Sequence, residues 1–353
     1  MDNSEFTKIL SHAFALLKNS DPIFQPTAFW AAASQQLADE IISMGIENFR
    51  QSPSALNYFV PTYGMPFNGH TEHSIAELTK ALAFASNSKV SLSLQCFLSG
   101  YEHALADYRV LLASESLVKT APYLQNFSES TYGNPKEHFC FDDKFYSRSA
   151  LNYLLGLAFL KKHIDASALR TVMEIGGGFG SLGEILVKTG TNEIQYIDID
   201  IPPTSCVALA YLATVFGVDK VYDGNLVLDS RPLAITSLPQ ISVFNSWQIA
   251  QLEGEIDLFV NFISFQEMEP SVVANYLKYV KRLKPRWILL RNLREGKQIK
   301  KENQLGVELP ILGEDYITML SEYQLHARQV WPFAYKTVDG FHSELMLFNL
   351  KEF

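Results

Sequence analysis

The sequence predicts an α/β protein with a helical N-terminal part, residues 1–143, and a mainly parallel sheet in residues 144–353. Two observations predict this division. Before residue 144, apolar side chains recur every three or four positions between loops rich in proline and glycine, which is typical of amphipathic helices. After it, short apolar runs alternate with helical segments, as in a parallel sheet with helices on both faces.

The N-terminal part is predicted to contain four helices and two irregular segments. Thr27 can cap the start of the second helix and Gly45 can end it. The irregular segments, 50–70 and 121–143, hold several prolines and glycines. The helices are expected over 5–18, 27–44, 72–87 and 91–115.

The C-terminal part is predicted to contain seven strands, which alternate with helices until the last pair. The final two strands are joined without a helix, so we expect them to be antiparallel. Segment 218–240 has no clear assignment. The strands are expected over 171–175, 194–199, 241–244, 256–261, 286–290, 324–331 and 342–350, and the helices over 144–163, 181–189, 204–216, 271–283 and 313–322.

The composition of the 353-residue chain excludes several classes of protein. Hydrophobic residues make up 47%, enough for a large core, which excludes a disordered or fibrous chain. The 29 Lys and Arg residues against 38 Asp and Glu residues give a net charge of −9. Phosphate binding needs a basic surface, so nucleic acid is not expected as the main partner.

The cysteines and the apolar segments bear on the compartment. Cys96, Cys140 and Cys206 lie far apart, without the paired spacing of a disulfide framework or a structural zinc site. No stretch approaches 18 uncharged apolar residues, so no membrane span is predicted. The N-terminal residues lack the pattern of a signal peptide. We therefore expect the cytoplasm.

A glycine-rich run, VMEIGGGFGS at 172–181, is the most informative motif. It stands between a predicted strand and a predicted helix, where glycines allow close backbone approach and a helix start offers free N–H groups. A dinucleotide site of the form G-x-G-x-x-G would begin at Gly176 and Gly178 and would need glycine at Ser181. That requirement argues against such a site.

The pattern that fits is acid-x-Gly-x-Gly-x-Gly, formed by Glu174, Gly176, Gly178 and Gly180. Gly177 lies between the first two of these glycines. An acid before the glycines is unfavourable for a pyrophosphate. It suits a ligand with a cationic end, such as the amino group and sulfonium of S-adenosylmethionine. Asp198 and Asp200 share one face of the next strand, and we expect one of them to bind a ribose diol.

These residues resemble the class I S-adenosylmethionine-dependent methyltransferases. More narrowly, the chain resembles the sugar O-methyltransferase family of polysaccharide and antibiotic glycoside pathways. The stretches that carry the resemblance are FWAAASQQLADEIISMGIENFR at 29–50, STYGNPKEHF at 130–139, VMEIGGGFGSLGEIL at 172–186, YIDIDIP at 196–202 and IDLFVNFISFQEM at 256–268.

The resemblance implies a Rossmann-like, seven-stranded methyltransferase sheet whose last strand is antiparallel, with an N-terminal helical cap. It implies S-adenosylmethionine as cofactor. In related enzymes an Asp-Leu-Pro triplet ends the second strand, and its Asp binds ribose. The corresponding triplet, 200–202, favours Asp200. The resemblance also implies that Asn245, Ser246 and Trp247 lie by the adenine, although Trp247 is equally consistent with a core position.

O-Methylation of a sugar is an in-line displacement, and a neutral hydroxyl needs a general base. Segment 261–268, after the fourth strand, lies where ligands bind in such sheets. Glu267 is the first candidate for the base, with Ser264 and Gln266 as orienting groups. A capping or salt-bridge role is the alternative for Glu267, and His342 is the second candidate base.

Aromatic side chains in the N-terminal loops, such as Tyr63 and Tyr132, are candidates for stacking on a sugar ring. Phe29 and Trp30 stand at helical spacing, which is more typical of a core. The spacing of three residues between His70 and His73 would suit a metal on a helix, but their neighbours are those of a helix start, so no metal is predicted. Tyr58, Phe59 and Phe67 are further loop aromatics.

Other functions stay open at this point. The acceptor could be a non-sugar small molecule, such as a phenol or carboxylate. An NAD-dependent oxidoreductase is disfavoured by Ser181. A non-catalytic module that keeps the fold is a further alternative. The sequence leaves open whether a sugar acceptor is free, nucleotide-linked or polymer-bound, and whether the chain forms a homo-oligomer.

Overall fold

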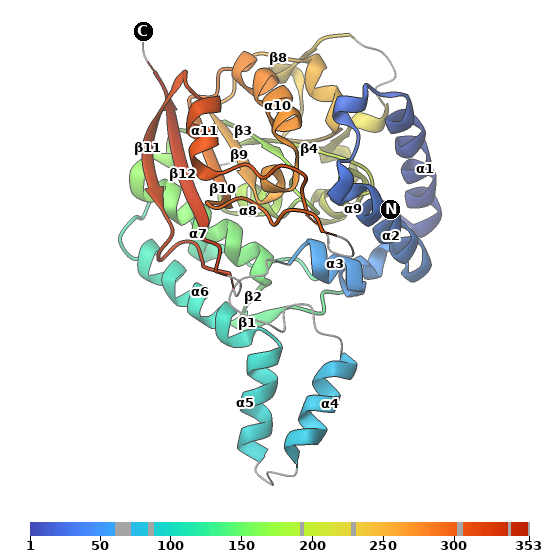
Figure 1. The fold of residues 1–353 in the computed structure, drawn as a ribbon, viewed down its shortest axis with the longest axis vertical. Coiled ribbons are helices and arrows are strands. Elements are labelled where there is room, and N and C mark those ends of the chain that lie inside the picture. The colour runs from blue at the N-terminus through green and yellow to red at the C-terminus, as the bar shows by residue number, and fades with distance from the viewer. Residues whose placement is uncertain are drawn as a thin grey trace.

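The computed structural model describes residues 1–60, 72–83, 88–190, 194–226, 231–301, 306–337 and 340–351. Its centre is an eight-stranded sheet with the order β11-β12-β10-β9-β3-β4-β7-β5 (Figure 1). The strands of this sheet are β3 (Thr171–Ile175), β4 (Gln195–Asp200), β5 (Val221–Asp223), β7 (Ile241–Asn245), β9 (Leu258–Phe262), β10 (Trp287–Leu293), β11 (Tyr323–Gln329) and β12 (Ser343–Leu350).

The sheet is doubly wound, as predicted. From the central strand β3 the chain builds outward through β4 and β7 and then returns to form β9 and β10 on the other side. The strand order therefore reverses between β3 and β9, and ligands bind beyond the carboxyl ends of parallel strands at such a point. The last strand, β12, is antiparallel to both of its neighbours, which confirms that prediction.

The main sheet has eight strands, one more than the seven expected. The additional strand is β5, which pairs in parallel with β7 at the sheet edge. It lies inside segment 218–240, which the sequence left unassigned. A three-residue strand is too short to show an alternating pattern, so only its pairing with β7 defines it.

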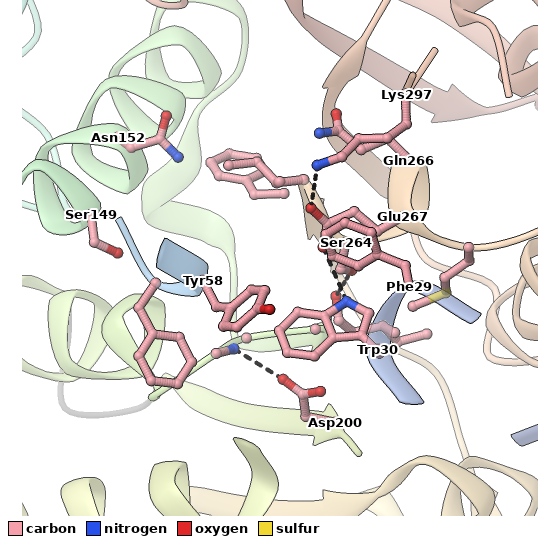
Figure 2. A pocket seen from close by; sticks show the side chains of 18 of the residues that line it. Phe29, Trp30, Tyr58, Ser149, Asn152, Asp200, Ser264, Gln266, Glu267 and Lys297 are labelled. Atoms are coloured by element: carbon pink, nitrogen blue, oxygen red, sulfur yellow. Dashed lines mark hydrogen bonds and ion pairs between the residues drawn. The ribbon is translucent and has the colours of Figure 1, made fainter. Parts of the chain in front are cut away.

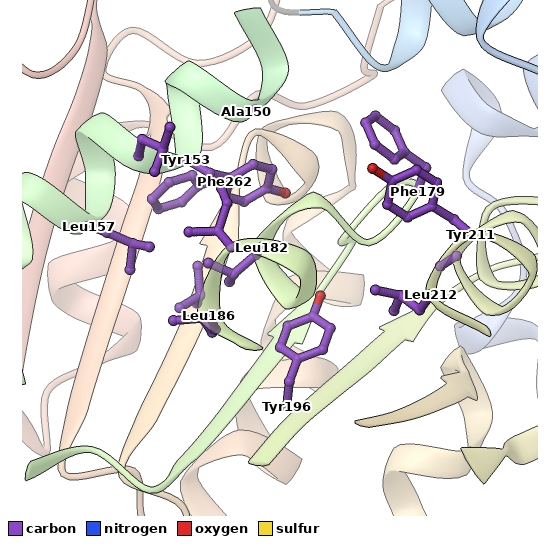
Figure 3. Packing of buried hydrophobic residues seen from close by; sticks show 14 of the residues in the cluster. Ala150, Tyr153, Leu157, Phe179, Leu182, Leu186, Tyr196, Tyr211, Leu212 and Phe262 are labelled. Atoms are coloured by element: carbon purple, nitrogen blue, oxygen red, sulfur yellow. The ribbon is translucent and has the colours of Figure 1, made fainter. Parts of the chain in front are cut away.

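Helices cover both faces of the sheet, and the sheet separates the core into two clusters, one on each face. On one face, α7, α8 and α9 pack on residues such as Val172 and Tyr196, and Figure 3 shows this packing. On the other face, α10 and α11 pack on alternate strand residues such as Met173 and Ile197. The helices are α7 (Arg148–His163), α8 (Ser181–Thr189), α9 (Thr204–Phe216), α10 (Pro270–Arg282) and α11 (Gly313–Met319).

The N-terminal part is mainly helical, and α4 and α5 project from the body of the molecule (Figure 1). Two predictions need correction. Segment 50–70 is not wholly a loop, because the Ser52 hydroxyl accepts a hydrogen bond from Ala55 N and caps a short helix. The predicted helix 91–115 is two helices, broken at Gly100 with φ +84°. The helices are α1 (Asn3–Asn19), α2 (Ala28–Met44), α3 (Pro53–Tyr58), α4 (Glu72–Ala83), α5 (Ser88–Leu98) and α6 (Tyr101–Glu115).

A hairpin of β1 (Phe139–Phe141) and β2 (Lys144–Tyr146) spans residue 144, so α7 starts at Arg148 rather than at the predicted 144. Two further short strands, β6 (Leu233–Ala234) and β8 (Leu252–Glu253), pair with each other outside the main sheet. None of the helices in the described ranges has the length and apolar character that crossing a membrane requires.

A buried carboxylate, Glu129, joins the N-terminal part to the start of α7. It accepts hydrogen bonds from Arg50 Nη2 at 2.9 Å, Ser147 N at 2.6 Å and Ser147 Oγ at 2.9 Å. Burial acts to raise the pKa of Glu129, but the Arg50 guanidinium and His138 hold it below its ordinary value. The carboxylate is therefore ionised and fixes three chain segments.

Replacement of this carboxylate by an amide, Glu129→Gln, is expected to destabilise the fold by about 3–5 kcal/mol, because the Arg50 charge stays buried without its partner. Urea unfolding followed by circular dichroism measures the change. The exposed Glu253→Gln variant is the control. A loss below about 1 kcal/mol would show that the pair contributes no more than a surface salt bridge.

Candidate functional site

A cavity of about 630 Å³ opens at the carboxyl ends of β3, β4 and β9, where the strand order reverses (Figure 2). One wall is the glycine turn after β3 together with the end of β4. A second wall is the segment after β9 with the start of α7. Among the described residues, the N-terminal helices α2 and α3 and the segments around 297 and 335 line further sides. Both parts of the chain therefore build the site.

The glycine turn lies against the cavity through Gly176, Gly177 and Gly178. At Gly176 the backbone has φ +77°, and a Cβ would lie 2.1 Å from Ser264 Oγ. Only glycine fits both constraints. Gly180 has a different role: it is the N-cap of α8, and a Cβ there would meet Leu212 at 2.9 Å, so it serves helix packing outside the described cavity wall.

The structure distinguishes between the two candidate acids of β4. Asp200 lines the cavity, where its Oδ2 accepts a hydrogen bond from Gly178 N at 3.0 Å and its Oδ1 one from Ile201 N at 2.7 Å. Asp198 is fully buried, and a Cβ at Gly177 would lie 2.4 Å from its Oδ1. Asp198 thus lies beneath the glycine turn and not in the cavity wall.

Glu174 also lies beneath the turn, as the cross-strand partner of Asp198. It is fully buried and accepts a hydrogen bond from the Tyr196 hydroxyl at 2.7 Å. Burial raises the pKa of Glu174 to about 8. Burial and the charges of neighbouring carboxyl groups also raise the pKa of Asp198, and burial raises that of Asp200. Three carboxyl groups therefore gather under and beside the glycine turn.

These raised pKa values predict the pH dependence of stability. An acidic side chain whose pKa is higher in the folded than in the unfolded protein contributes fully to stability at pH values below its unfolded pKa. This contribution is lost as the pH rises through the pKa of the folded state, which is about 8 for Glu174. The ligand-free protein should therefore lose stability between about pH 5 and pH 8. Glu174→Gln, which stays neutral, should reduce this loss by roughly 1–3 kcal/mol.

Thermal unfolding of both proteins at several pH values measures the effect. The comparison of wild type with Glu174→Gln removes the contributions of all groups that the two proteins share. Parallel stability profiles for the two proteins would contradict a proton bound at Glu174 in the folded state.

Of the three residues expected beside the adenine, only Ser246 belongs to the described cavity wall, and its hydroxyl donates to Phe24 O at 2.9 Å. Asn245 is buried behind it and accepts a hydrogen bond from Ser205 Oγ at 2.8 Å. Trp247 is half-buried and packs against the core cluster under α10. The indole therefore has the core position that the sequence left as the alternative.

Glu267 lines the cavity and is held by two contacts at its carboxylate (Figure 2). Trp30 Nε1 donates to Oε2 at 3.0 Å, and Lys297 Nζ lies 2.8 Å from Oε1. The Thr27 hydroxyl also donates to the Glu267 carbonyl oxygen at 3.1 Å. Glu267 therefore makes the salt bridge weighed as its alternative role, but it does not cap α10, whose N-cap is Glu269.

Three other candidates lie elsewhere. His342 is outside the cavity wall that the described residues form, with Nδ1 2.7 Å from Glu295 Oε1. Tyr132 packs against the rings of Phe49 and Tyr211 instead of facing the cavity. Tyr63 lies outside the described residues, as do Phe67, His70 and the side chain of His73.

Several residues of the cavity wall were not singled out from the sequence. Trp30, assigned to the core by its helical spacing, lines the cavity. On α7, Ser149, Asn152 and Tyr153 reach the cavity at spacings of three and four, a pattern that looks like any buried helix face. Lys297, Tyr335 and Thr337 come from segments without a motif, and only the fold brings them to the site.

The predicted site residues are thus divided between the cavity wall and positions outside it. Gly176, Gly177, Gly178, Asp200 and Ser246 border the cavity, and Gln266 and Glu267 lie on its far side. No three His, Cys, Asp or Glu side chains within the described ranges form a group that could hold a metal ion.

No family model and no curated protein matches this chain. Solved structures do match it. The magnesium protoporphyrin IX methyltransferase of Synechocystis PCC 6803, with bound SAH, is 12% identical over 58% of this chain and 84% of that chain, with a TM-score of 0.39. A mitomycin 7-O-methyltransferase is 12% identical over 96% of this chain and 76% of that chain, also at 0.39.

A third structure, the 1,6-didemethyltoxoflavin-N1-methyltransferase of Burkholderia thailandensis with bound 1,6-didemethyltoxoflavin and S-adenosylhomocysteine, is 14% identical over 57% of this chain and 79% of that chain, with a TM-score of 0.39. Likenesses of this size do not say what this chain binds or transfers.

Proposed function

We propose that this chain is an S-adenosylmethionine-dependent O-methyltransferase and that its acceptor is a sugar hydroxyl. The observation that carries the proposal is the position of Asp200, which lies at the cavity edge beside the glycine turn. A carboxylate at this position can accept hydrogen bonds from both hydroxyls of a ribose diol. The turn itself lets the backbone approach the rest of the nucleoside.

The charge of the site supports a cofactor with a positive centre. Asp200 lines the cavity beside the glycine turn, and Glu267 lines it on the opposite side. A sulfonium and an ammonium group are stabilised by nearby carboxylates, whereas a pyrophosphate is repelled by them. This arrangement favours S-adenosylmethionine over a dinucleotide.

The walls away from the glycine turn support a sugar acceptor. They combine aromatic rings from the N-terminal helices, such as Trp30 and Tyr58, with polar side chains such as Ser149, Asn152 and Gln266. A pyranose has apolar C–H faces and a polar edge of hydroxyls, so it matches both kinds of surface. On the same grounds we propose that residues 1–143 supply the aromatic wall of the acceptor site, while residues 144–353 hold the cofactor and supply the polar side chains that face the acceptor.

Glu267 is the proposed general base. S-adenosylmethionine supplies the electrophilic methyl group, so the chain has to align the acceptor oxygen and remove its proton. Lys297 and Trp30 each use one lone-pair site of the carboxylate, and an ionised carboxylate offers about four such sites. Glu267 therefore keeps the capacity to accept a proton while its position is fixed.

A non-sugar aromatic acceptor is the second candidate, because Phe29, Trp30, Tyr58 and Tyr335 all line the cavity. From the resemblance noted in the sequence we propose that the reaction belongs to polysaccharide or glycoside biosynthesis, with a free, nucleotide-linked or polymer-bound acceptor. We propose the cytoplasm as the compartment, since the three cysteines are free and well separated.

Isothermal titration calorimetry tests cofactor binding. The wild-type protein should bind S-adenosylmethionine and S-adenosylhomocysteine. Asp200→Asn should weaken both at least tenfold, because the amide oxygen is a poorer partner for the ribose diol than a carboxylate. Asp219→Asn, which changes an exposed acid, is the matched control. Absence of binding to the wild-type protein would overturn the proposal.

Glu267→Gln should lower turnover by roughly 10²–10⁴-fold on any acceptor that the wild-type enzyme methylates, because the amide cannot take a proton. Affinity for S-adenosylhomocysteine should stay within about twofold, since the adenosyl site is elsewhere. Trp30→Phe removes one contact of the carboxylate but keeps the base, so its loss of turnover should be much smaller. Equal losses in the two variants would assign Glu267 a structural role instead.

A further inference from the structure

The side-chain amide of Asn152 is held in one orientation by a buried arginine. Arg291, on β10, is 1% exposed, and its guanidinium lies over the Phe262 ring at 5.0 Å from carbon to ring centre. One of its nitrogens, Nη2, donates to Phe333 O at 2.6 Å, and the other, Nη1, donates to Asn152 Oδ1. A guanidinium can only donate hydrogen bonds, so the oxygen of the amide must face Arg291.

The nitrogen of this amide then faces the opposite direction. Asn152 lines the cavity, and Figure 2 shows its nitrogen turned toward the interior. Rotating the amide by 180° would place two N–H groups against a buried cation, which is strongly unfavourable. Asn152 is therefore a hydrogen-bond donor of fixed direction.

Gln266 is oriented in the same way from the other side of the cavity (Figure 2). Its Oε1 accepts a hydrogen bond from Leu293 N at 2.7 Å, and a backbone N–H is also a donor only. The Nε2 end of Gln266 is therefore the end that can donate to a ligand in the cavity, which this side chain lines. Lys297, beside it, is already paired with Glu267.

We propose that Asn152 and Gln266 form a donor-only subsite that binds oxygen atoms flanking the methylated hydroxyl of the acceptor, with Arg291 as the residue that positions Asn152. This inference rests on the proposed function and specifies it. Fixed donors select a ring that carries neighbouring oxygens and reject a ring without them, because the amides would then lose water without gaining a partner.

The test uses S-adenosylhomocysteine at saturation and measures the binding of simple probes by calorimetry. The probes are the methyl glycosides of glucose, galactose, mannose and rhamnose, with cyclohexanol and phenol as rings that lack the flanking oxygens. At least one glycoside should bind the wild-type protein, and cyclohexanol and phenol should bind at least tenfold more weakly.

Asn152→Asp and Gln266→Glu are nearly isosteric changes that keep the oxygens facing Arg291 and Leu293 N. Each replaces the inward N–H₂ by an acceptor, so each should weaken glycoside binding at least tenfold. S-adenosylhomocysteine should still bind with unchanged affinity. Gln324→Glu, an amide-to-acid change at an exposed position of β11, is the control and should have no effect.

Arg291→Lys tests the positioning role. A lysine cannot hold the amide with the same planar fork, so glycoside affinity should fall. In the double variant with Asn152→Asp the two losses should not add, because both act through one amide. Additive losses would show that Arg291 does not position Asn152.

The subsite is overturned if no glycoside binds, if cyclohexanol or phenol binds as well as the glycosides, or if Asn152→Asp leaves glycoside binding unchanged. Failure of the wild-type protein to bind S-adenosylhomocysteine is a separate result and contradicts the proposed function itself.

Discussion

The site depends on one tight contact between the glycine turn and the end of β9. The carbonyl oxygen of Ile175 accepts hydrogen bonds from Asn261 Nδ2 at 2.9 Å and Ser264 Oγ at 3.1 Å, and Gly176 N donates to Ile199 O at 2.8 Å. A side chain at Gly176 would collide with Ser264. The turn after β3 is thus fixed to both neighbouring strands at the point where the strand order reverses.

Everything else at the site is built around this contact. It places Asp200 next to the backbone of the turn and puts two further carboxyl groups, Glu174 and Asp198, beneath it. Across the cavity, Glu267 binds Trp30 and Lys297, which ties helix α2 of the N-terminal part to the segment after β9. The helical part is therefore a wall of the site and not an appendage.

Much of the fold was predictable because it is recorded in local patterns. The strand 171–175 was predicted with the same bounds that the structure shows, since a short apolar run ends at glycines. Strand β5 and helix α3 were missed because both are short and are defined by pairing or by a single cap. The break at Gly100 was missed because helical spacing continues on both sides.

The candidate site was predictable where it follows a motif or the end of a predicted strand. The glycines and Asp200 come from contiguous segments whose geometry is local. Asn152 and Lys297 come from segments far apart in the chain, and only packing brings them to the cavity. His342 and Tyr132 were suggested by position near an expected strand end or in an expected loop, and each has its partners outside the cavity wall of the described residues.

We propose that this cavity holds the adenosyl cofactor at the glycine turn, with the acceptor beyond it. A crystal structure with S-adenosylhomocysteine tests this claim most directly. The ribose diol is expected at Asp200, and the sulfur is expected to point toward the wall that carries Gln266 and Glu267. Ligand bound elsewhere on the chain, or a cavity without ligand at saturating concentration, would contradict it.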